Sequence, residues 1–356
     1  MKYVATCNPG LEDLLSREIL EEVPGARILW ERRGRGRVGV EAPAGEAQLR
    51  GFQRLRGAHS VYLLVAEAVV GKDRRGLERL YDLVRSSGVH RYIPFSGSFA
   101  VRSERIGEGH EYTSVDVARV AGQAVQEAYL EEYGVKPEVR LDAPSTAVYV
   151  EVDDDVARVG LLVSGEASMH RRGYRIYDHP AALKATLAYA LLRLASARDS
   201  SVILDPMCGG GTVAIEAALL FENARIVCND KNPRHIEGAM VNAMAARVYD
   251  RIEFIVSDAT MIHETLGEET VDYVASNPPY GIRLGDPRSV RSLYSKFIPS
   301  LAKTLRPCGR AAIVTTESAH AQRVALQAGL RLAHARRVRH GDLWVSLLVF
   351  EKPCND

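Results

Sequence analysis

From residue 179 onward, short apolar runs rich in β-branched residues alternate with helical patterns. A helical run over 181–195 comes first, and five strand-like runs follow it at 201–205, 224–230, 251–258, 271–277 and 309–316. Apolar strands that are separated by helices pair in parallel, and helices then cover both faces of the sheet. Two more strand-like runs close the chain as a hairpin-like pair. We therefore predict a doubly wound, mostly parallel α/β sheet over residues 179–356.

The first 70 residues follow a mixed order. KYVATC (2–7) is a predicted strand, and the next run places four apolar residues on one helical face, Leu11, Leu14, Leu15 and Ile19. Two short strands flank RRGRG (32–36), which predicts a hairpin with arginines at its tip. A helix and a long strand complete a βαββαβ order. This order predicts a ferredoxin-like domain over 1–70, although a small α+β module with a solvated arginine tip fits the same residues.

A second α+β pattern covers residues 71–166. A helix at 77–86 and a strand at 97–103 precede a long helix, for which Thr113 or Ser114 is the expected N-cap. Asp116 lies in the positive first turn of that helix. Three strand-like runs follow, and a polar, irregular connector comes after them. We predict a domain over 71–166, a linker over 167–178 and the α/β domain over 179–356.

Several classes of protein are disfavoured by composition. No apolar run approaches the roughly 18 residues that cross a bilayer, and the N-terminus lacks the regions of a signal peptide. We expect a cytoplasmic protein with no membrane partner. The five cysteines are far apart and form no CxxC pair. We therefore expect neither a disulfide framework nor a zinc or other metal site, and we interpret the cysteines as small buried hydrophobes.

Charge is unevenly distributed along the chain. The net charge is +1 overall, but it is +8 over residues 27–105 and −9 over residues 108–166. Of the 46 basic residues, 38 are arginine and 8 are lysine. Arginine suits bidentate contacts to phosphate, and a GC-rich genome produces the same excess. Both explanations remain open at this point.

The strongest constellation of residues begins at 202–220, VILDPMCGGGTVAIEAALL. An apolar strand ends at Asp205, three glycines (209–211) form a tight turn, and Thr212 opens a helix. Glycines allow a positive φ and let a ligand approach the backbone, and ligands of such sheets bind at the carboxyl ends of the strands. Dehydrogenases share this turn. A phosphate-binding P-loop is excluded, because no GKS or GKT sequence follows.

Two more acids follow neighbouring strands. Asp230 ends the second strand, where its carboxylate is placed to receive ribose hydroxyls, and Asp258 ends the third, where it is placed to accept a hydrogen bond from an adenine amine. Either acid alone is more often a helix cap or a surface turn. Together with Asp205 and the glycines, they predict an adenosine-containing ligand at one edge of the sheet.

The fourth strand delivers NPPYG (277–281) to the same edge. The exocyclic amine of a nucleobase is a poor nucleophile, because its lone pair is conjugated with the ring. The Asn277 side-chain oxygen and the Pro278 carbonyl form an acceptor pair for such an amine, which would aim its lone pair at a methyl donor. Tyr280 offers a ring for stacking. Asn-Pro also begins ordinary turns, but a turn does not explain the whole loop at this edge.

At these residues the chain resembles the amino-methylating class I S-adenosylmethionine-dependent methyltransferases. DPMCGGGTVAIEAAL with NPPYGIRLG is similar to the THUMP-containing tRNA guanine-N2 methyltransferases. ATCNPGLEDLLSREI, the run from SFAVRSER to HEYTSVDVARVAGQAV, and LLVSGEASMHRRGYR resemble their upstream regions. The resemblance spans nearly the whole chain. It implies an N-terminal ferredoxin-like domain, a THUMP RNA-binding domain and a Rossmann-fold methyltransferase domain.

The resemblance also implies roles for individual residues. Asp205, Gly209 and Gly211 would contact the methionine moiety of S-adenosylmethionine, Asp230 its ribose and Asp258 its adenine. Leu183 and Lys184 match an upstream cofactor motif, although a plain amphipathic helix explains them equally well. Asn277, Pro278 and Tyr280 would hold the guanine.

Relatives with NPPY rather than DPPY methylate position 6 of tRNA, in the acceptor stem, and THUMP domains are taken to grip the 3′ end. The resemblance thus implies tRNA as partner and N2-methylguanosine as product, and we expect a monomer. Our candidates for phosphate contacts are Arg32, Arg33, Arg35, Arg37, Arg102, Arg105, Arg171 and Arg172. Each of them alone is more often a solvated surface arginine.

Three other functions are compatible with parts of this pattern. The chain is also similar to enzymes that methylate guanine at another tRNA position or in ribosomal RNA. N6-adenine methylation of DNA shares the NPPY loop but does not explain the THUMP-like half. A catalytically silent RNA-binding adaptor would have no reason to keep the acids and the loop together.

Overall fold

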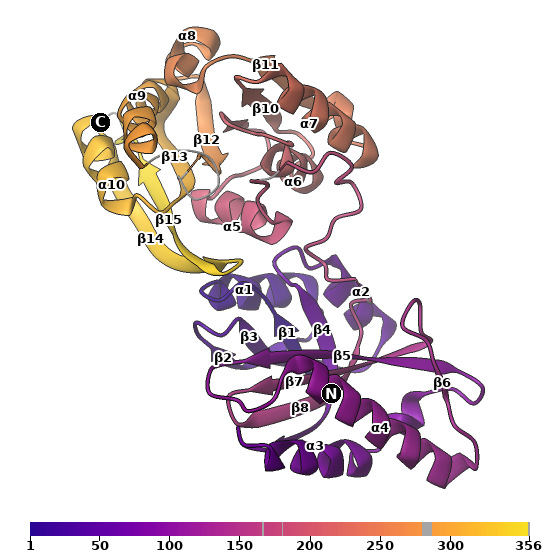
Figure 1. The fold of residues 1–356 in the computed structure, drawn as a ribbon. Coiled ribbons are helices and arrows are strands. Elements are labelled where there is room, and N and C mark those ends of the chain that lie inside the picture. Colours follow the sequence, from indigo (N-terminus) through magenta and orange to yellow (C-terminus); the bar gives the residue numbers. More distant parts are fainter. Residues whose placement is uncertain (166, 180, 280–286, 355–356) are drawn as a thin grey trace. The chain divides into compact units, whose positions relative to one another are not determined.

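The computed structural model describes residues 1–165, 167–179, 181–279 and 287–354. The chain forms two compact units. Unit 1 consists of Met1–Cys7 and Leu15–Met169, and unit 2 consists of Asn8–Leu14 and His170–Asp356. Each unit is built around one sheet, and Figure 1 labels their elements.

Unit 1 contains an eight-stranded sheet in the order β2-β3-β1-β4-β8-β7-β5-β6. Its elements are β1 (Lys2–Thr6), α1 (Glu12–Glu22), β2 (Arg27–Arg32), β3 (Arg37–Glu41), α2 (Glu46–Arg54), β4 (Ser60–Val69), α3 (Arg75–Ser86), the 3-10 turn η1 (Val89–Tyr92), β5 (Ser98–Ile106), α4 (Ser114–Tyr133), β6 (Glu138–Val139), β7 (Thr146–Asp153) and β8 (Val156–Leu162).

The predicted βαββαβ order of the first 70 residues is confirmed. Strand β1 pairs antiparallel with β3 and with β4, and β4 pairs antiparallel with β8. The strands of residues 1–70 and of residues 71–166 therefore belong to one continuous sheet. Helices α3 and α4 share a core with the strands of the second group. The predicted N-cap of α4 is present as a capping box, in which Thr113 and Asp116 bond each other's backbone N–H.

Arg37 does not lie on the surface of unit 1. Its side chain is only 4% exposed, and its Nε and Nη2 donate to Glu151 and Glu104 at 2.6 and 2.7 Å. Arg158 donates to the other oxygen of Glu151 at 2.9 Å. The two guanidinium groups hold the pKa of the buried Glu151 below its ordinary value, against the effect of burial. We predicted that Arg37 contacts phosphate. In the structure its guanidinium is instead used in a buried ion pair.

Unit 2 contains a seven-stranded sheet in the order β11-β10-β9-β12-β13-β15-β14. Its elements are α5 (Ala185–Ala195), β9 (Val202–Asp205), α6 (Thr212–Leu220), β10 (Arg225–Asp230), α7 (Pro233–Ala245), η2 (Tyr249–Arg251), β11 (Ile252–Val256), η3 (Ala259–Met261), α8 (Ile262–Leu266), β12 (Val271–Ser276), α9 (Pro287–Thr304), β13 (Leu305–Thr315), α10 (Ser318–Gln327), β14 (Arg331–His340) and β15 (Leu343–Glu351).

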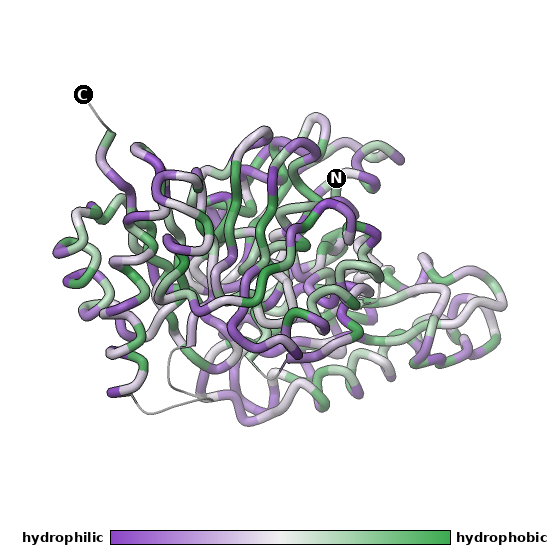
Figure 2. The backbone as a smooth tube through the Cα atoms, turned by 90° about the horizontal axis from the view of Figure 1, so that it is seen from above, coloured by the Kyte–Doolittle hydropathy of each residue, from purple (hydrophilic) through white to green (hydrophobic). Residues whose placement is uncertain are grey.

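The predicted doubly wound, mostly parallel sheet is confirmed. Strands β9 to β13 pair in parallel, and β15 joins β13 and β14 antiparallel. Leu204, Val227 and Val274 pack into a core cluster with α8, α9 and α10, while Ile203 and Ile226, which point the other way, are also buried. Figure 2 colours the backbone by hydropathy and shows apolar stretches alternating with polar ones along the chain. Among the described residues, no helix is long and apolar enough to span a membrane.

Helix α5 begins later than its sequence pattern predicts. The pattern extends from residue 181, but the helix starts at Ala185, with Lys184 in an extended N-cap conformation. The described residues before it form a turn, in which the Ala182 N–H donates to the His179 carbonyl at 2.9 Å. Residues 181–184 therefore precede the helix, and they line the candidate active site.

Our expectation that the cysteines would not form disulfides is wrong. Cys208 and Cys228 are joined with a Cα–Cα distance of 5.6 Å, and Cys308 and Cys354 with 4.6 Å. The first disulfide connects the glycine-rich turn to β10, and the second connects β13 to the segment after β15. Spacing in the sequence did not reveal either pair, because the sheet brings together residues that are 20 and 46 positions apart.

Candidate active site

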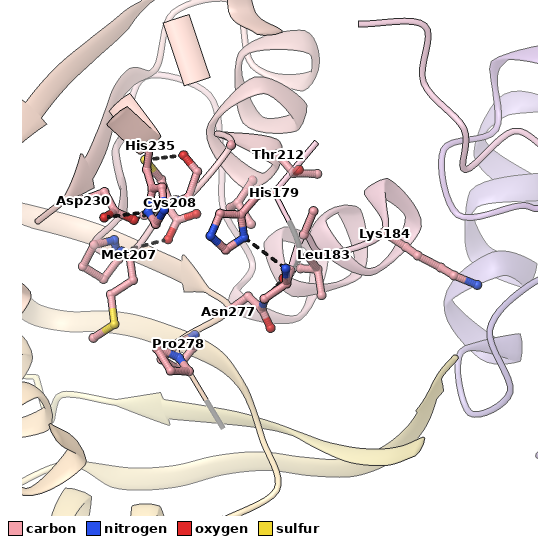
Figure 3. A pocket seen from close by; sticks show the side chains of 18 of the residues that line it. His179, Leu183, Lys184, Met207, Cys208, Thr212, Asp230, His235, Asn277 and Pro278 are labelled. Atoms are coloured by element: carbon pink, nitrogen blue, oxygen red, sulfur yellow. Dashed lines mark hydrogen bonds and ion pairs between the residues drawn. The ribbon is translucent and has the colours of Figure 1, made fainter. Parts of the chain in front are cut away.

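A cavity of about 1250 Å³ lies in unit 2 at the carboxyl ends of the parallel strands. The ends of β9, β10 and β12 and the segment after β11 all contribute to its wall, as expected for an open α/β sheet. The predicted site residues that line it are Leu183, Lys184, Asp205, Gly209, Asp230, Asp258, Asn277 and Pro278, together with Arg171 and Arg172. Figure 3 shows part of this wall.

The glycine-rich turn connects two of the predicted acids. Gly209 has a φ of +51°, and its N–H donates to Asp230 Oδ2 at 3.0 Å. Gly211 has a φ of +79° and is the N-cap of α6, but it is not part of the cavity wall. A Cβ at Gly211 would lie 2.9 Å from the Ala239 Cβ. The structure thus places Gly209 at the cavity and gives Gly211 a role in packing α6 against α7.

Asp205 is a buried carboxyl group at the base of the cavity. It is 3% exposed, and its Oδ1 accepts hydrogen bonds from the Ser276 hydroxyl at 2.8 Å and the Met207 N–H at 3.3 Å. Burial raises the pKa of Asp205 to about 7, although both hydrogen bonds oppose this shift. Because Ser276 immediately precedes Asn277, this bond also ties the first predicted acid to the loop after β12.

The other two acids are held by backbone groups. Asp230 Oδ1 accepts from the Asn232 N–H at 2.9 Å and lies 3.2 Å from His235 Nδ1. Asp258 Oδ1 accepts from the Thr260 N–H at 2.8 Å, and this bond lowers the pKa of Asp258 below its ordinary value. Asp258 is exposed, whereas Asp230 is 8% exposed. Both carboxylates keep lone pairs for a ligand in the cavity.

The described part of the NPPY loop contains a buried amide with an unused acceptor. Asn277 Nδ2 donates to the Ala181 carbonyl at 3.1 Å, and Asn277 Oδ1 has no hydrogen-bond partner among the described residues. Pro278 is buried beside it. Tyr280 lies outside the residues that the structure describes. A buried acceptor without a partner is costly, and a donor on a bound ligand would satisfy this oxygen, for which the described residues supply none.

One wall of the cavity is basic. Arg171 is exposed, and the nearby Arg172 donates to the buried Glu216 at 3.1 Å. Arg175 donates to the Leu183 carbonyl at 2.6 Å, and Lys184 lines the cavity at the start of α5. Burial and, to a smaller extent, the surrounding basic side chains lower the pKa of His170 in this wall to about 4. The wall therefore favours a polyanionic ligand.

The remaining predicted arginines belong to unit 1. Arg33 is the most exposed of them, with an 84% exposed side chain. Arg32 and Arg35 pair with Asp153 and Asp154 at 3.0 and 2.6 Å. Arg102 and Arg105 are half-buried. Arg102 donates to the Leu141 carbonyl, and Arg105 bonds the His110 ring.

Several cavity residues were not identified from the sequence. They are His170, Arg175, His179, Met207, Thr212, Lys231, His235 and the β14–β15 turn residues His340, Gly341, Asp342 and Leu343. Met207 and Thr212 lie close to the three glycines in the sequence, so their place in the cavity wall could have been predicted from the motif. The turn residues carry no local signal, because only the antiparallel end of the sheet brings them to this edge.

The lining fits S-adenosylmethionine. Three carboxylates in one cavity offer acceptors for an amino group, a ribose and an adenine amine, and Gly209 leaves the backbone open, since a Cβ there would meet no atom closer than 3.6 Å. Among the described residues, no group of three or more His, Cys, Asp or Glu side chains forms a metal site.

Comparisons with known proteins agree with this geometry. Residues 172–346 match the family described as RMKL-like, methyltransferase domain, and residues 74–162 match the THUMP domain. The chain is 34% identical to the tRNA (guanine(6)-N2)-methyltransferase of Archaeoglobus fulgidus, over 98% of this chain and 92% of that protein. It is 35% identical to the enzyme of the same name from Thermus thermophilus, over 98% of each chain.

A solved structure extends the similarity to three dimensions. The crystal structure of TrmN from Thermus thermophilus matches with a TM-score of 0.78 and 32% identity, over 99% of each chain. The predicted resemblance is thereby confirmed over nearly the full length of the protein. The chain belongs to the family of THUMP-containing, S-adenosylmethionine-dependent tRNA (guanine(6)-N2)-methyltransferases.

Proposed function

We propose that this protein transfers a methyl group from S-adenosylmethionine to the exocyclic N2 of guanosine 6 in the acceptor stem of tRNA. The observation that carries this proposal is the Asn277 amide: Asn277 lines the acid-lined cavity, and its buried Oδ1 lacks a partner among the described residues. The names of the full-length relatives support the substrate and the position.

Cofactor binding is assigned to the three acids and the glycine turn. Asp205 and the Gly209 backbone hold the methionine moiety, Asp230 the ribose and Asp258 the adenine amine, and Leu183 and Lys184 complete the wall. S-adenosylmethionine supplies an electrophilic methyl group on a sulfonium. We retain Gly211 as a residue that shapes the turn, because it packs against Ala239 rather than lining the cavity.

The guanine amine is oriented by acceptors. Asn277 Oδ1 and the Pro278 carbonyl accept its two N–H bonds, which stabilises the positive charge that develops on nitrogen during transfer. Tyr280, outside the described residues, stays in the proposal as the stacking partner of the base. The rate gain comes from orientation and charge stabilisation, and no strong base is required. A guanosine in a stem must be flipped out of its stack to enter the cavity.

RNA binding is assigned to the predicted arginines whose side chains are at least partly exposed. In unit 2 these are Arg171 and Arg172 in the basic wall, and in unit 1 they are Arg33 with Arg32, Arg35, Arg102 and Arg105. Arg37 is left out, because its guanidinium is buried against Glu151. We propose that the THUMP domain binds the 3′ end of the tRNA and that the protein acts as a monomer in the cytoplasm.

The reaction is tested with unmodified tRNA and S-adenosylmethionine labelled in its methyl group, followed by digestion and identification of the labelled nucleoside. We expect N2-methylguanosine. Asn277→Ala should lower kcat by about 10²–10³, the size of one oriented transition-state contact. Asn223→Ala is the matched control, since Asn223 is an exposed asparagine that bonds Asp199. N6-methyladenosine as product, or full activity of Asn277→Ala, would contradict the proposal. A wild-type protein that binds tRNA but transfers no methyl group would be the silent adaptor.

A further inference from the structure

The turn that precedes α5 is organised by one imidazole. His179 Nδ1 accepts a hydrogen bond from the Ala181 N–H at 3.1 Å, and the His179 carbonyl accepts from the Ala182 N–H at 2.9 Å. An N–H group can only donate, so His179 Nδ1 must be the unprotonated nitrogen of the ring. The first bond holds the N–H on one side of the Ala181 Cα, and the second holds the peptide group that joins Ala181 to Ala182 and contains the Ala181 carbonyl. Together they fix the backbone on both sides of Ala181 and therefore the direction of its carbonyl.

The Ala181 carbonyl in turn determines the orientation of the Asn277 amide. A carbonyl oxygen can only accept, so the Asn277 group that lies 3.1 Å from the Ala181 oxygen must be the NH₂. The amide oxygen is then the atom left buried without a partner among the described residues. If the amide were flipped, two oxygens would face each other, and the donor group would stand where the substrate amine needs an acceptor.

The same imidazole contacts the proposed cofactor site. Its ring meets His235 edge-on, with ring centroids 4.5 Å apart, and His235 Nδ1 lies 3.2 Å from Asp230 Oδ1. A Cβ at Gly209 would lie 3.6 Å from His179 Cγ. Figure 3 shows His179 between His235 and Asn277. The imidazole therefore lies in the wall of the proposed cofactor site and also acts on the amide of the catalytic loop through the backbone of Ala181.

We propose that His179 is a positioning residue for methyl transfer: it accepts the Ala181 N–H so that the Ala181 carbonyl holds the Asn277 amide with its oxygen toward the guanine amine. His179 itself touches no reacting atom. This inference rests on the proposed function, because it assigns the orientation of Asn277 for that reaction.

The charge state of His179 matters for this role. Burial lowers the pKa of His179 below its ordinary value, and His235 on α7 adds to the effect, whereas Asp230 at the end of β10 and the adjacent Asp178 oppose it. This shift favours the neutral ring, in agreement with the hydrogen bond that Nδ1 accepts from the Ala181 N–H. Protonation would place an N–H against the Ala181 N–H and break the bond. This role of His179 thus predicts that kcat falls as the pH is lowered through the pKa of His179.

Two substitutions separate the hydrogen bond from the packing of the ring. His179→Phe keeps a ring against Gly209 and His235 but removes the acceptor, whereas His179→Asn removes the ring and keeps an acceptor near the position of Nδ1. With saturating tRNA transcript, we expect His179→Phe to lower kcat about tenfold, the effect of one hydrogen bond. His179→Asn should retain kcat within about threefold, and its kcat should lose the acid limb that belongs to His179.

Controls address folding and cofactor binding. His320→Phe is the matched control, because His320 bonds Ser295, Arg323 and the Arg291 carbonyl and does not line the cavity. The affinity for S-adenosylmethionine, measured by calorimetry, should change less than about threefold in His179→Phe, since an apolar ring can replace the packing contact. If His179→Phe does not fold, His179→Leu carries the same test.

A double-mutant cycle tests the connection to the amide directly. Asn277→Asp removes the NH₂ group that bonds Ala181, so His179→Phe should cause no further loss of kcat in that background. Equal losses in His179→Phe and His179→Asn, a loss confined to cofactor affinity, or additive effects with Asn277→Asp would overturn the inference. A wild-type protein that forms no N2-methylguanosine would instead refute the proposed function.

Discussion

Asp205 is an ionisable group of the proposed cofactor site whose charge changes near neutral pH. Its carboxyl is buried with a pKa raised to about 7, so a substantial fraction is protonated near neutrality. The ammonium of a methionine moiety prefers the ionised carboxylate. Asp205 becomes protonated as the pH falls through its pKa, and the affinity for S-adenosylmethionine should decrease over the same pH range.

The affinity for S-adenosylmethionine should therefore fall up to about tenfold between pH 8 and pH 6, as expected for a single group that must be ionised. Calorimetric titrations at a series of pH values measure this. Asp205→Asn should bind weakly with little pH dependence over the same range. An affinity that is flat in the wild-type protein would show that Asp205 does not contact a charged part of the cofactor.

At this scale the sequence predicted the residue types of the cavity well. Asp205, Asp230 and Asp258 lie in one wall because each stands at or just after the end of a parallel strand. The apolar strand pattern and the glycine-rich motif in the sequence both indicated this. The orientation of Asn277 was not predictable, because it depends on the Ala181 carbonyl, 96 positions away. Gly211 was expected at the ligand, but its role in helix packing depends on Ala239, which no local pattern identifies.

Two arginines of the β2–β3 hairpin show how whole elements decide whether a side chain is buried. Arg33 and Arg37 are four residues apart on one hairpin, yet the first is 84% exposed and the second 4% exposed. Arg33 lies in the turn after β2 and Arg37 is the first residue of β3, but this local position does not predict that the sheet continues through β4 into β8 and β7. That continuation brings Glu151 against Arg37.

Arg33→Gln and Arg37→Gln should therefore behave differently. Removing one partner of a buried ion pair costs roughly 3–5 kcal/mol, so Arg37→Gln should lower the free energy of unfolding of unit 1 by an amount of this order. Arg33→Gln should leave stability unchanged, weaken tRNA binding and lower the salt dependence of binding by about one charge. Urea unfolding and tRNA titrations at several salt concentrations measure both effects. Similar stability losses in the two variants would contradict the ion-pair account.

The Cys308–Cys354 disulfide should contribute to the thermal stability of the protein. It closes a separation of 46 residues between β13 and the segment after β15. Cross-links of such length stabilise a fold by about 2–4 kcal/mol, mainly by restricting the unfolded chain. Cys308→Ala with Cys354→Ala should lower the Tm and make it less sensitive to reductant. Cys7→Ala is the control, since Cys7 belongs to neither disulfide. A Tm unchanged by the double substitution would show that this cross-link adds nothing to stability.

At the scale of the whole molecule, the protein combines a THUMP-containing unit with a methyltransferase unit, and relatives align with it from end to end. The fold class was predictable because the order of strand-like and helical runs differs between the two halves: mixed in the first and regularly alternating in the second. The shared sheet of unit 1 and the disulfides were not, since both depend on contacts between distant residues.

The most direct test of the central claim is to map the methylated nucleotide on a tRNA transcript by mass spectrometry after reaction with S-adenosylmethionine. The account predicts one N2-methylguanosine per tRNA, at position 6, and its loss when guanosine 6 is replaced by adenosine. N2-methylguanosine that persists in the substituted transcript, or that forms only in ribosomal RNA, would contradict the account.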